Sequence, residues 1–213
     1  VQQYFQSHTI AEHSEALLKN PRDAQLYNRR GVAGAHGAWK LRMAMDDFDT
    51  AIALAPDYKP AYLNRGKFYM SLILAEPDAE QQQLALAIAD FNTALQLDQS
   101  YAEAYANRGL AHSVQGKYEL AIADFQQAIR LNRRHAVAYF GLAQAYEQQG
   151  RAPEAVEAYR AVIRHLPAYE TSQSKDLIRE AAGIVGLSPA YLIGSVDTYI
   201  RLAQERIAAL GGK

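Results

Sequence analysis

The sequence of 213 residues contains no cysteine, and this absence excludes disulfide bonds, thiolate catalysis and cysteine-ligated zinc. It also lacks a run of about 18 apolar residues, so no segment is predicted to span a bilayer. Neither sign of charge dominates, because 22 lysines and arginines stand against 23 aspartates and glutamates. The net charge of −1 gives no overall attraction to nucleic acid or anionic lipid, and we expect neither as a partner.

The remaining composition is that of an ordinary folded protein, with 49% hydrophobic and 21% charged residues. The sequence begins at Val1 without a signal-peptide pattern, which predicts a processed or trimmed start. Since a cysteine-free chain is compatible with either side of a membrane, the compartment stays open. We favour the cytoplasm, with an exported or membrane-associated complex as the alternative.

Motifs for catalysis or metal binding are also missing. The sequence has no serine nucleophile elbow, no kinase motif set and no pair of carboxylates in a glycine-framed pocket. His8 and His13 lie five residues apart, whereas ligands on one helix face lie four apart. Asp46, Asp47 and Asp49 fall in a predicted helix, where a calcium loop cannot form. We therefore expect neither an enzyme nor a bound metal or cofactor.

An internal repeat is the dominant feature. The stretches "LYNRRGVAGA", "AYLNRGKFYM" and "AYANRGLAHS" are each followed by an amphipathic run, of which "LAIADFQQAIRLN" is the clearest. The best unit covers 34 residues, from 102 to 135. Its Tyr105, Gly109, Ala121, Phe125 and Ala128 fall at unit positions 4, 8, 20, 24 and 27.

This pattern resembles the tetratricopeptide repeat, a helix–turn–helix unit. The resemblance implies an all-α fold, an α-solenoid of stacked repeats with capping helices. Four units are predicted, at 24–58, 59–101, 102–135 and 136–169. The second unit carries nine extra residues around "LAEPDAEQQQ", and the fourth has Ala143 in place of the glycine.

The two ends of the chain depart from the pattern. Residues 1–23 include a helix ended at Pro21, which is either half a repeat or a cap. Residues 170–213 predict two helices, at 174–185 and from 188 to about 210. The second helix has one apolar face, made of Leu192, Val196, Tyr199, Ala203, Ile207 and Leu210. We expect a C-terminal helical cap, with a homodimer or partner contact through residues 188–210 as the alternative.

The resemblance also implies where a partner binds. In this family the first helix of each unit lines a concave face suited to an extended peptide. Mapping the lining positions onto this sequence gives a mixed surface, with apolar anchors among polar side chains. The predicted groove residues are Arg29, His36, Leu63, Asn64, Lys67, Met70, Asn107, Leu110, Val114, Phe140 and Gln144.

Asn64 and Asn107 share unit position 6. An amide there can bind a peptide group, as in family members with a ladder of asparagines, or it can tie adjacent helices together. A subfamily that grips the C-terminal carboxylate of chaperones needs five particular residues. Only Asn64 matches them, so a chaperone clamp is not expected.

The stretch "RRGVAGAHGAWK" raises the question of a phosphate loop. Such a loop needs a preceding strand and a glycine directly before the lysine, and both are missing. Gly31 instead falls at unit position 8, where helices pack closely. Gly34 and Gly37 remove further side chains, which predicts a shallow depression beside His36.

Arg133, Arg134 and His135 form a basic cluster between units three and four. The cluster is a solvated turn, or it accepts a helix C-terminus or an acidic partner segment. We expect a scaffold or adaptor that binds a peptide or partner segment. The alternative is a structural subunit that docks through its C-terminal helix and convex face.

Overall fold

The structure is a computed structural model and describes residues 2–35, 41–73, 80–165 and 196–211. These residues form ten helices and no strand, so the predicted all-α fold is confirmed. The helices are α1 (Gln2–Lys19), α2 (Ala24–Gly34), α3 (Leu41–Leu54), α4 (Lys59–Leu72), α5 (Glu80–Leu97), α6 (Ala102–Val114), α7 (Tyr118–Leu131), α8 (Ala136–Gln148), α9 (Ala152–His165) and α12 (Val196–Ala209).

Helices such as α3 and α7 form because their apolar residues recur every three or four positions. In α7, for example, Ala121, Ile122, Phe125 and Ala128 are all buried. The turn from α6 to α7 passes through Gly116, whose φ of 71° lies in the left-handed region where a side chain is strained. Gly150 has the same φ between α8 and α9. Local sequence therefore sets both the helices and the sharp turns between them.

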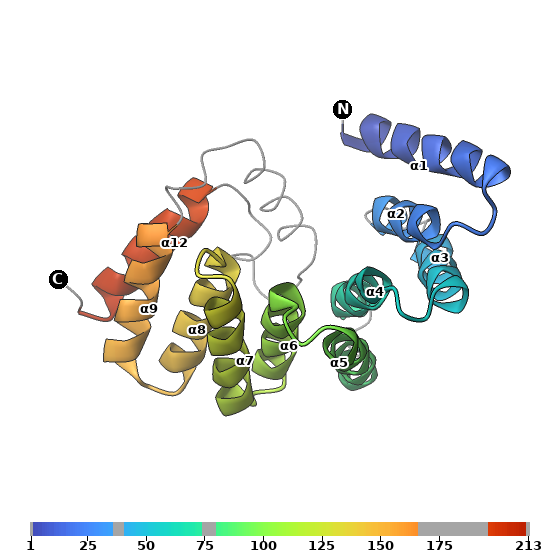
Figure 1. The fold of residues 1–213 in the computed structure, drawn as a ribbon. Coiled ribbons are helices and arrows are strands. Elements are labelled where there is room, and N and C mark those ends of the chain that lie inside the picture. Colours follow the sequence, from blue (N-terminus) through green and yellow to red (C-terminus); the bar gives the residue numbers. More distant parts are fainter. Residues whose placement is uncertain (1, 36–40, 74–79, 166–195, 212–213) are drawn as a thin grey trace.

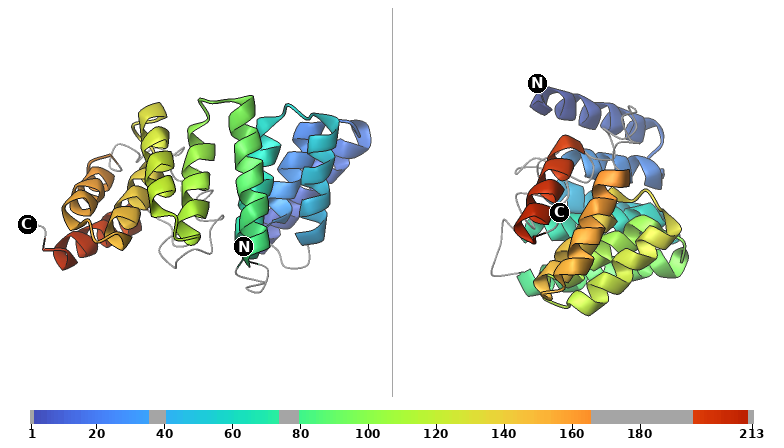
Figure 2. Two further views of the ribbon diagram at one scale, coloured as in Figure 1. Left: turned by 90° about the horizontal axis from the view of Figure 1, so that it is seen from below. Right: turned by 90° about the vertical axis from the view of Figure 1, so that its left-hand side faces the viewer.

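The helices stack in two layers in chain order, as Figures 1 and 2 show. Consecutive helices contact one another from α1 to α9, and α12 contacts α9. The first helices of successive pairs, α2, α4, α6 and α8, also approach one another, more closely than the second helices do. Tighter spacing on one side curves the stack, so the first helices line its inner face.

The N-terminal helix α1 packs like the second helix of a pair. Arg30 Nη1 on α2 donates to Ser14 on α1 at 3.3 Å. The equivalent Arg65 and Arg108 reach Asp49 and Asn92 on the second helix of the preceding pair. Tyr27 on α2 donates to the Pro21 carbonyl, as Tyr62 on α4 does to that of Pro56.

At the other end, α12 lies against α9 (Figure 1). Ala203 is fully buried there, and Ile200, Leu202, Ile207 and Leu210 pack against the same core. The apolar face predicted for this helix is thus used within the chain over its described part. The predicted helix at 174–185 and the start of the helix predicted from Ser188 lie outside the described residues.

Candidate partner-binding surface

A buried ion pair joins the two helices of each of the first three pairs. Arg108 donates through Nε and Nη2 to both carboxylate oxygens of Asp124, at 2.9 and 2.7 Å. Arg30–Asp47 and Arg65–Asp90 repeat this geometry. The three aspartates are at most 6% exposed, so two parallel hydrogen bonds compensate for their burial. The pairing also raises the pKa of each arginine, which keeps it charged.

The residue after each arginine is a glycine that faces the phenylalanine after each aspartate. A Cβ at Gly31, Gly66 or Gly109 would lie 2.8, 2.6 or 2.9 Å from the ring of Phe48, Phe91 or Phe125. Contacts that short do not occur, so the helices approach closely only because a side chain is missing. The small-residue role predicted for unit position 8 agrees with this packing.

The α8–α9 pair replaces all four residues together. Leu142 and Ala158 take the places of arginine and aspartate, and both are buried. Ala143 and Tyr159 take the places of glycine and phenylalanine. Tyr159 donates through its hydroxyl to Glu147 Oε2 at 3.0 Å.

Glu147 also pairs with Arg206 of α12, whose Nε lies 3.1 Å from Oε2. The Glu147 carboxylate lies near the C-terminal end of α8 and therefore links this helix to both α9 and α12. Glu147 lies three residues after the predicted groove residue Gln144, and its carboxylate holds the C-terminal helix.

Four predicted groove residues belong to the core instead. Leu63 is 6% exposed, Met70 2%, Leu110 3% and Phe140 1%. Leu63 and Met70 pack in one cluster with Phe91, and Leu110 and Phe140 in another with Phe125. Phe140 also meets Tyr159 edge to face at 5.5 Å. The prediction that these four offer accessible apolar contacts is wrong, because burying them between neighbouring helices is more favourable than exposing them.

The other predicted groove residues keep exposed surface. Arg29 is exposed, and Asn64, Lys67, Asn107, Val114 and Gln144 are half-buried. They lie on the inner helices α2, α4, α6 and α8, so the surface that remains is mainly polar. His36 lies outside the described residues.

Two asparagines on this surface hold hydrogen bonds of their own. Asn64 Nδ2 donates to Asn28 Oδ1 at 3.0 Å and so ties α4 to α2. Asn107 Nδ2 donates to the Glu103 carbonyl one turn earlier in α6. The helix-tying role is thus present at Asn64, while the Asn107 hydrogen bond lies within its own helix.

The asparagines at unit position 6 do not continue into α8, where Gly141 takes that position. A Cβ at Gly141 would lie 2.5 Å from Phe125 Cζ. The ring of Phe125 therefore lies between Gly109 of its own pair and Gly141 of the next. The signal was present as a glycine at unit position 6, but only the contact shows its cause.

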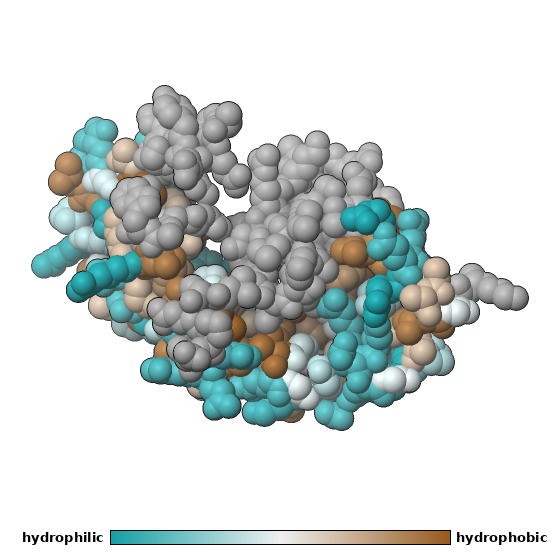
Figure 3. All heavy atoms as spheres, turned by 180° about the vertical axis from the view of Figure 1, so that it is seen from behind, coloured by the Kyte–Doolittle hydropathy of each residue, from teal (hydrophilic) through white to brown (hydrophobic). Residues whose placement is uncertain are grey.

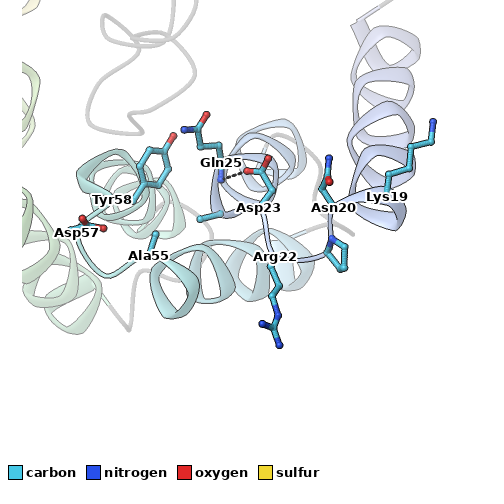
Figure 4. A pocket seen from close by; sticks show the side chains of 10 residues that line it. Lys19, Asn20, Arg22, Asp23, Gln25, Ala55, Asp57 and Tyr58 are labelled. Atoms are coloured by element: carbon cyan, nitrogen blue, oxygen red, sulfur yellow. Dashed lines mark hydrogen bonds between the residues drawn. The ribbon is translucent and has the colours of Figure 1, made fainter.

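The depression predicted around the glycines of α2 is not supported. Gly34 is buried, so the position is already filled by neighbouring atoms. Gly37 lies outside the described residues, as does His36. The structure does contain an open cavity of about 870 Å³ elsewhere, between the α1–α2 and α3–α4 turns. Figure 4 shows the residues that line it, with Gln25 and Tyr58 projecting to one side in this view and Arg22 to the opposite side.

Within the described ranges, no three histidine, aspartate or glutamate residues gather as a metal site. No helix there combines the length and hydrophobicity needed to cross a bilayer. On the face in Figure 3, teal and brown side chains alternate among the described residues, so apolar surface is distributed in small areas.

Two models of known protein families match the sequence of these helix pairs. A tetratricopeptide repeat model matches residues 108–170, and a TPR repeat model matches residues 78–113. The chain is a tetratricopeptide repeat protein. No curated protein matches the sequence.

Solved structures share the fold. A thermophilic TPR protein of Thermus thermophilus is 23% identical, with a TM-score of 0.66 over 82% of this chain and 88% of its own. MamA (41-end) of Desulfovibrio magneticus RS-1 is 19% identical, with a TM-score of 0.60 over 78% and 88%. The first TPR of Spaghetti (RPAP3), bound to the HSP90 peptide SRMEEVD, is 23% identical, with a TM-score of 0.52 over 60% and 94%. At these identities the likeness establishes the fold alone.

Proposed function

We propose that this tetratricopeptide repeat protein is an interaction scaffold that binds a segment of another protein along the inner face of α2, α4, α6 and α8. The observation that carries the proposal is a line of accessible polar side chains on successive inner helices. Arg29, Asn64, Asn107 and Gln144 each come from a different pair. Amides and a guanidinium present donors and acceptors along a path that an extended backbone can follow.

The comparisons support a binding role. A domain with the same fold holds a peptide in the first TPR of Spaghetti (RPAP3). Tetratricopeptide repeats are generally interaction modules and not enzymes. The apolar residues beneath the inner face serve the core, so the proposed recognition rests on polar contacts and on rigidity of the stacked helices.

The test is capture of the partner by the immobilised full-length chain and by two triple variants. Arg29→Ala, Asn64→Ala and Asn107→Ala together remove inner-face contacts. Arg42→Ala, Gln81→Ala and Gln96→Ala remove exposed side chains from the second helices. We expect the inner-face variant to lose the captured protein and the control variant to keep it.

Thermal unfolding of both variants separates lost contacts from lost folding. Since Asn64 bonds to buried Asn28, Asn107→Lys alone serves as a second inner-face variant. Equal capture by all forms would refute the inner-face assignment.

The second candidate is a structural subunit of a larger complex, docked through the C-terminal helix and the convex face. The apolar face of α12 is occupied by α9 within the chain, which favours a cap over a free docking helix. A homodimer through residues 188–210 remains a proposal. Removing residues 188–213 and measuring mass in solution tests it, because a dimer would become a monomer.

A further inference from the structure

The turn between α7 and α8 differs in charge from the three turns before it on the same edge of the stack. Each of those four-residue turns contains a carboxylate, namely Asp23, Asp57 or Asp98. The turn at 132–135 has none and carries Arg133 and Arg134. Arg130, two residues before the turn, adds a third cation.

The backbone of this turn is fixed by its own hydrogen bonds. Asn132 Oδ1 accepts from the Arg134 amide at 3.0 Å, and the His135 amide donates to the Asn132 carbonyl at 3.0 Å. His135 Nδ1 accepts from the Ala138 amide and caps α8. The two arginine side chains are exposed on this rigid base, so little backbone entropy is lost when they bind.

The three arginines have no carboxylate partner among the described residues. Arg130 Nε donates to the neutral oxygen of Gln127 at 2.9 Å, and Arg133 and Arg134 make no ion pair there. By contrast, Lys59, the first residue of α4, is paired with Asp98 of the preceding α5–α6 turn. Nearby Leu131 is 39% exposed, and Tyr139 stacks on His165 at 5.0 Å. The patch therefore combines unneutralised charge with apolar surface.

We propose that Arg130, Arg133 and Arg134 form a second interaction surface, separate from the inner face, that binds a short acidic segment of a partner protein with an apolar residue against Leu131. Guanidinium groups pair with carboxylates through two parallel hydrogen bonds, which suits this chemistry.

The surroundings select a short segment over a long polyanion. Asp57 and Asp98 occupy the neighbouring turns of this edge, and Glu157 is exposed on α9. Nucleic acid or an anionic membrane needs a wider run of cations than these three arginines, and the neighbouring turns supply carboxylates in their place. A segment of a few residues contacts the arginines alone.

The test measures binding of a fluorescent peptide, Glu-Glu-Leu-Glu-Glu-Leu-Glu-Glu, to the full-length chain at low salt. We expect binding that weakens about tenfold or more in Arg133→Glu/Arg134→Glu and also weakens with added salt. The matched control is Arg22→Glu/Arg42→Glu, which makes the same charge change at exposed sites on other elements. It should bind like the unmodified chain.

Equal losses in both variants, or no binding by the unmodified chain, would overturn the proposal. Tighter binding of duplex DNA or phosphatidylserine vesicles than of the peptide would overturn the choice of partner. The inner-face variant Asn107→Lys should bind the peptide normally, so failure of this surface is distinguishable from failure of the inner-face proposal.

Discussion

The first three helix pairs and the α8–α9 pair solve the same packing problem with different chemistry. In the first three, an arginine and an aspartate lock the helices together and a glycine admits a phenylalanine ring. In the fourth, Leu142 and Ala158 replace the charges, and Tyr159 turns its hydroxyl to Glu147. All four positions therefore differ together in the α8–α9 pair.

The difference also has a positional meaning. The α8–α9 pair adjoins α12, and its Glu147 binds Arg206 of that helix. The charge that ties the two helices of a pair together elsewhere is thus replaced by one that attaches the C-terminal helix.

The largest loss of stability is expected from breaking one of the buried arginine–aspartate pairs. Asp124→Ala leaves Arg108 half-buried without its carboxylate, and should lower the free energy of unfolding by about 3 kcal/mol. Arg108→Leu with Asp124→Ala installs the apolar lock of the fourth pair and should cost only about 1 kcal/mol. Urea unfolding measures both. A double variant as unstable as the single one would contradict the idea of interchangeable sets.

Gly66→Ala should be the next most harmful change. Its Cβ would lie 2.6 Å from Phe91 Cε1, and the strain should cost about 2 kcal/mol although alanine favours helices. The reverse change in the fourth pair, Ala143→Gly, should cost about 1 kcal/mol through helix propensity alone. Thermal unfolding compares the two, and a stabilised Gly66→Ala would show that the close approach does not exist.

Arg206→Ala should loosen α12 by about 1 kcal/mol, since it removes the ion pair to Glu147. Amide hydrogen exchange should speed up in residues 196–211 and stay unchanged in α2. The control is Arg201→Ala, whose partner Glu205 lies on the same helix. Equal exchange in the two variants would show that the link to α8 does not hold α12.

The smallest effect concerns the α5–α6 turn. Lys59 and Ser100 lower the pKa of Asp98 to about 2, from an ordinary value of 3.8. Its ionised form therefore adds stability above pH 3.8, and this contribution disappears as pH falls toward about 2. Asp98→Asn should flatten the loss of Tm over this interval, and Lys59→Met should do the same. An unchanged pH profile in both variants would exclude the pair as its source.

Much of the fold could be predicted from the sequence, because recurring residues report local packing directly. Gly109 and Phe125 have counterparts at the same positions of the first two pairs, because each of these three pairs has the same close approach. The all-α class and the turn at Gly116 followed from the same regularity.

The candidate surface was less predictable. A unit position locates a residue on a helix face, but it does not say how far a neighbouring helix covers that face. The pattern therefore predicts Phe140 and Met70 as surface residues, whereas both are core residues. The ion pair between Glu147 and Arg206 joins residues far apart in the sequence, so no local sequence pattern predicts it.

The inner face of the first helices is the proposed binding site for a partner segment. A photo-crosslinking residue placed at Asn107, on α6 of the inner face, tests it most directly when compared with the same residue at Gln96 on α5, where the side chain is exposed. We expect the captured partner to crosslink from position 107 and not from position 96. Crosslinking from position 96 alone would contradict it.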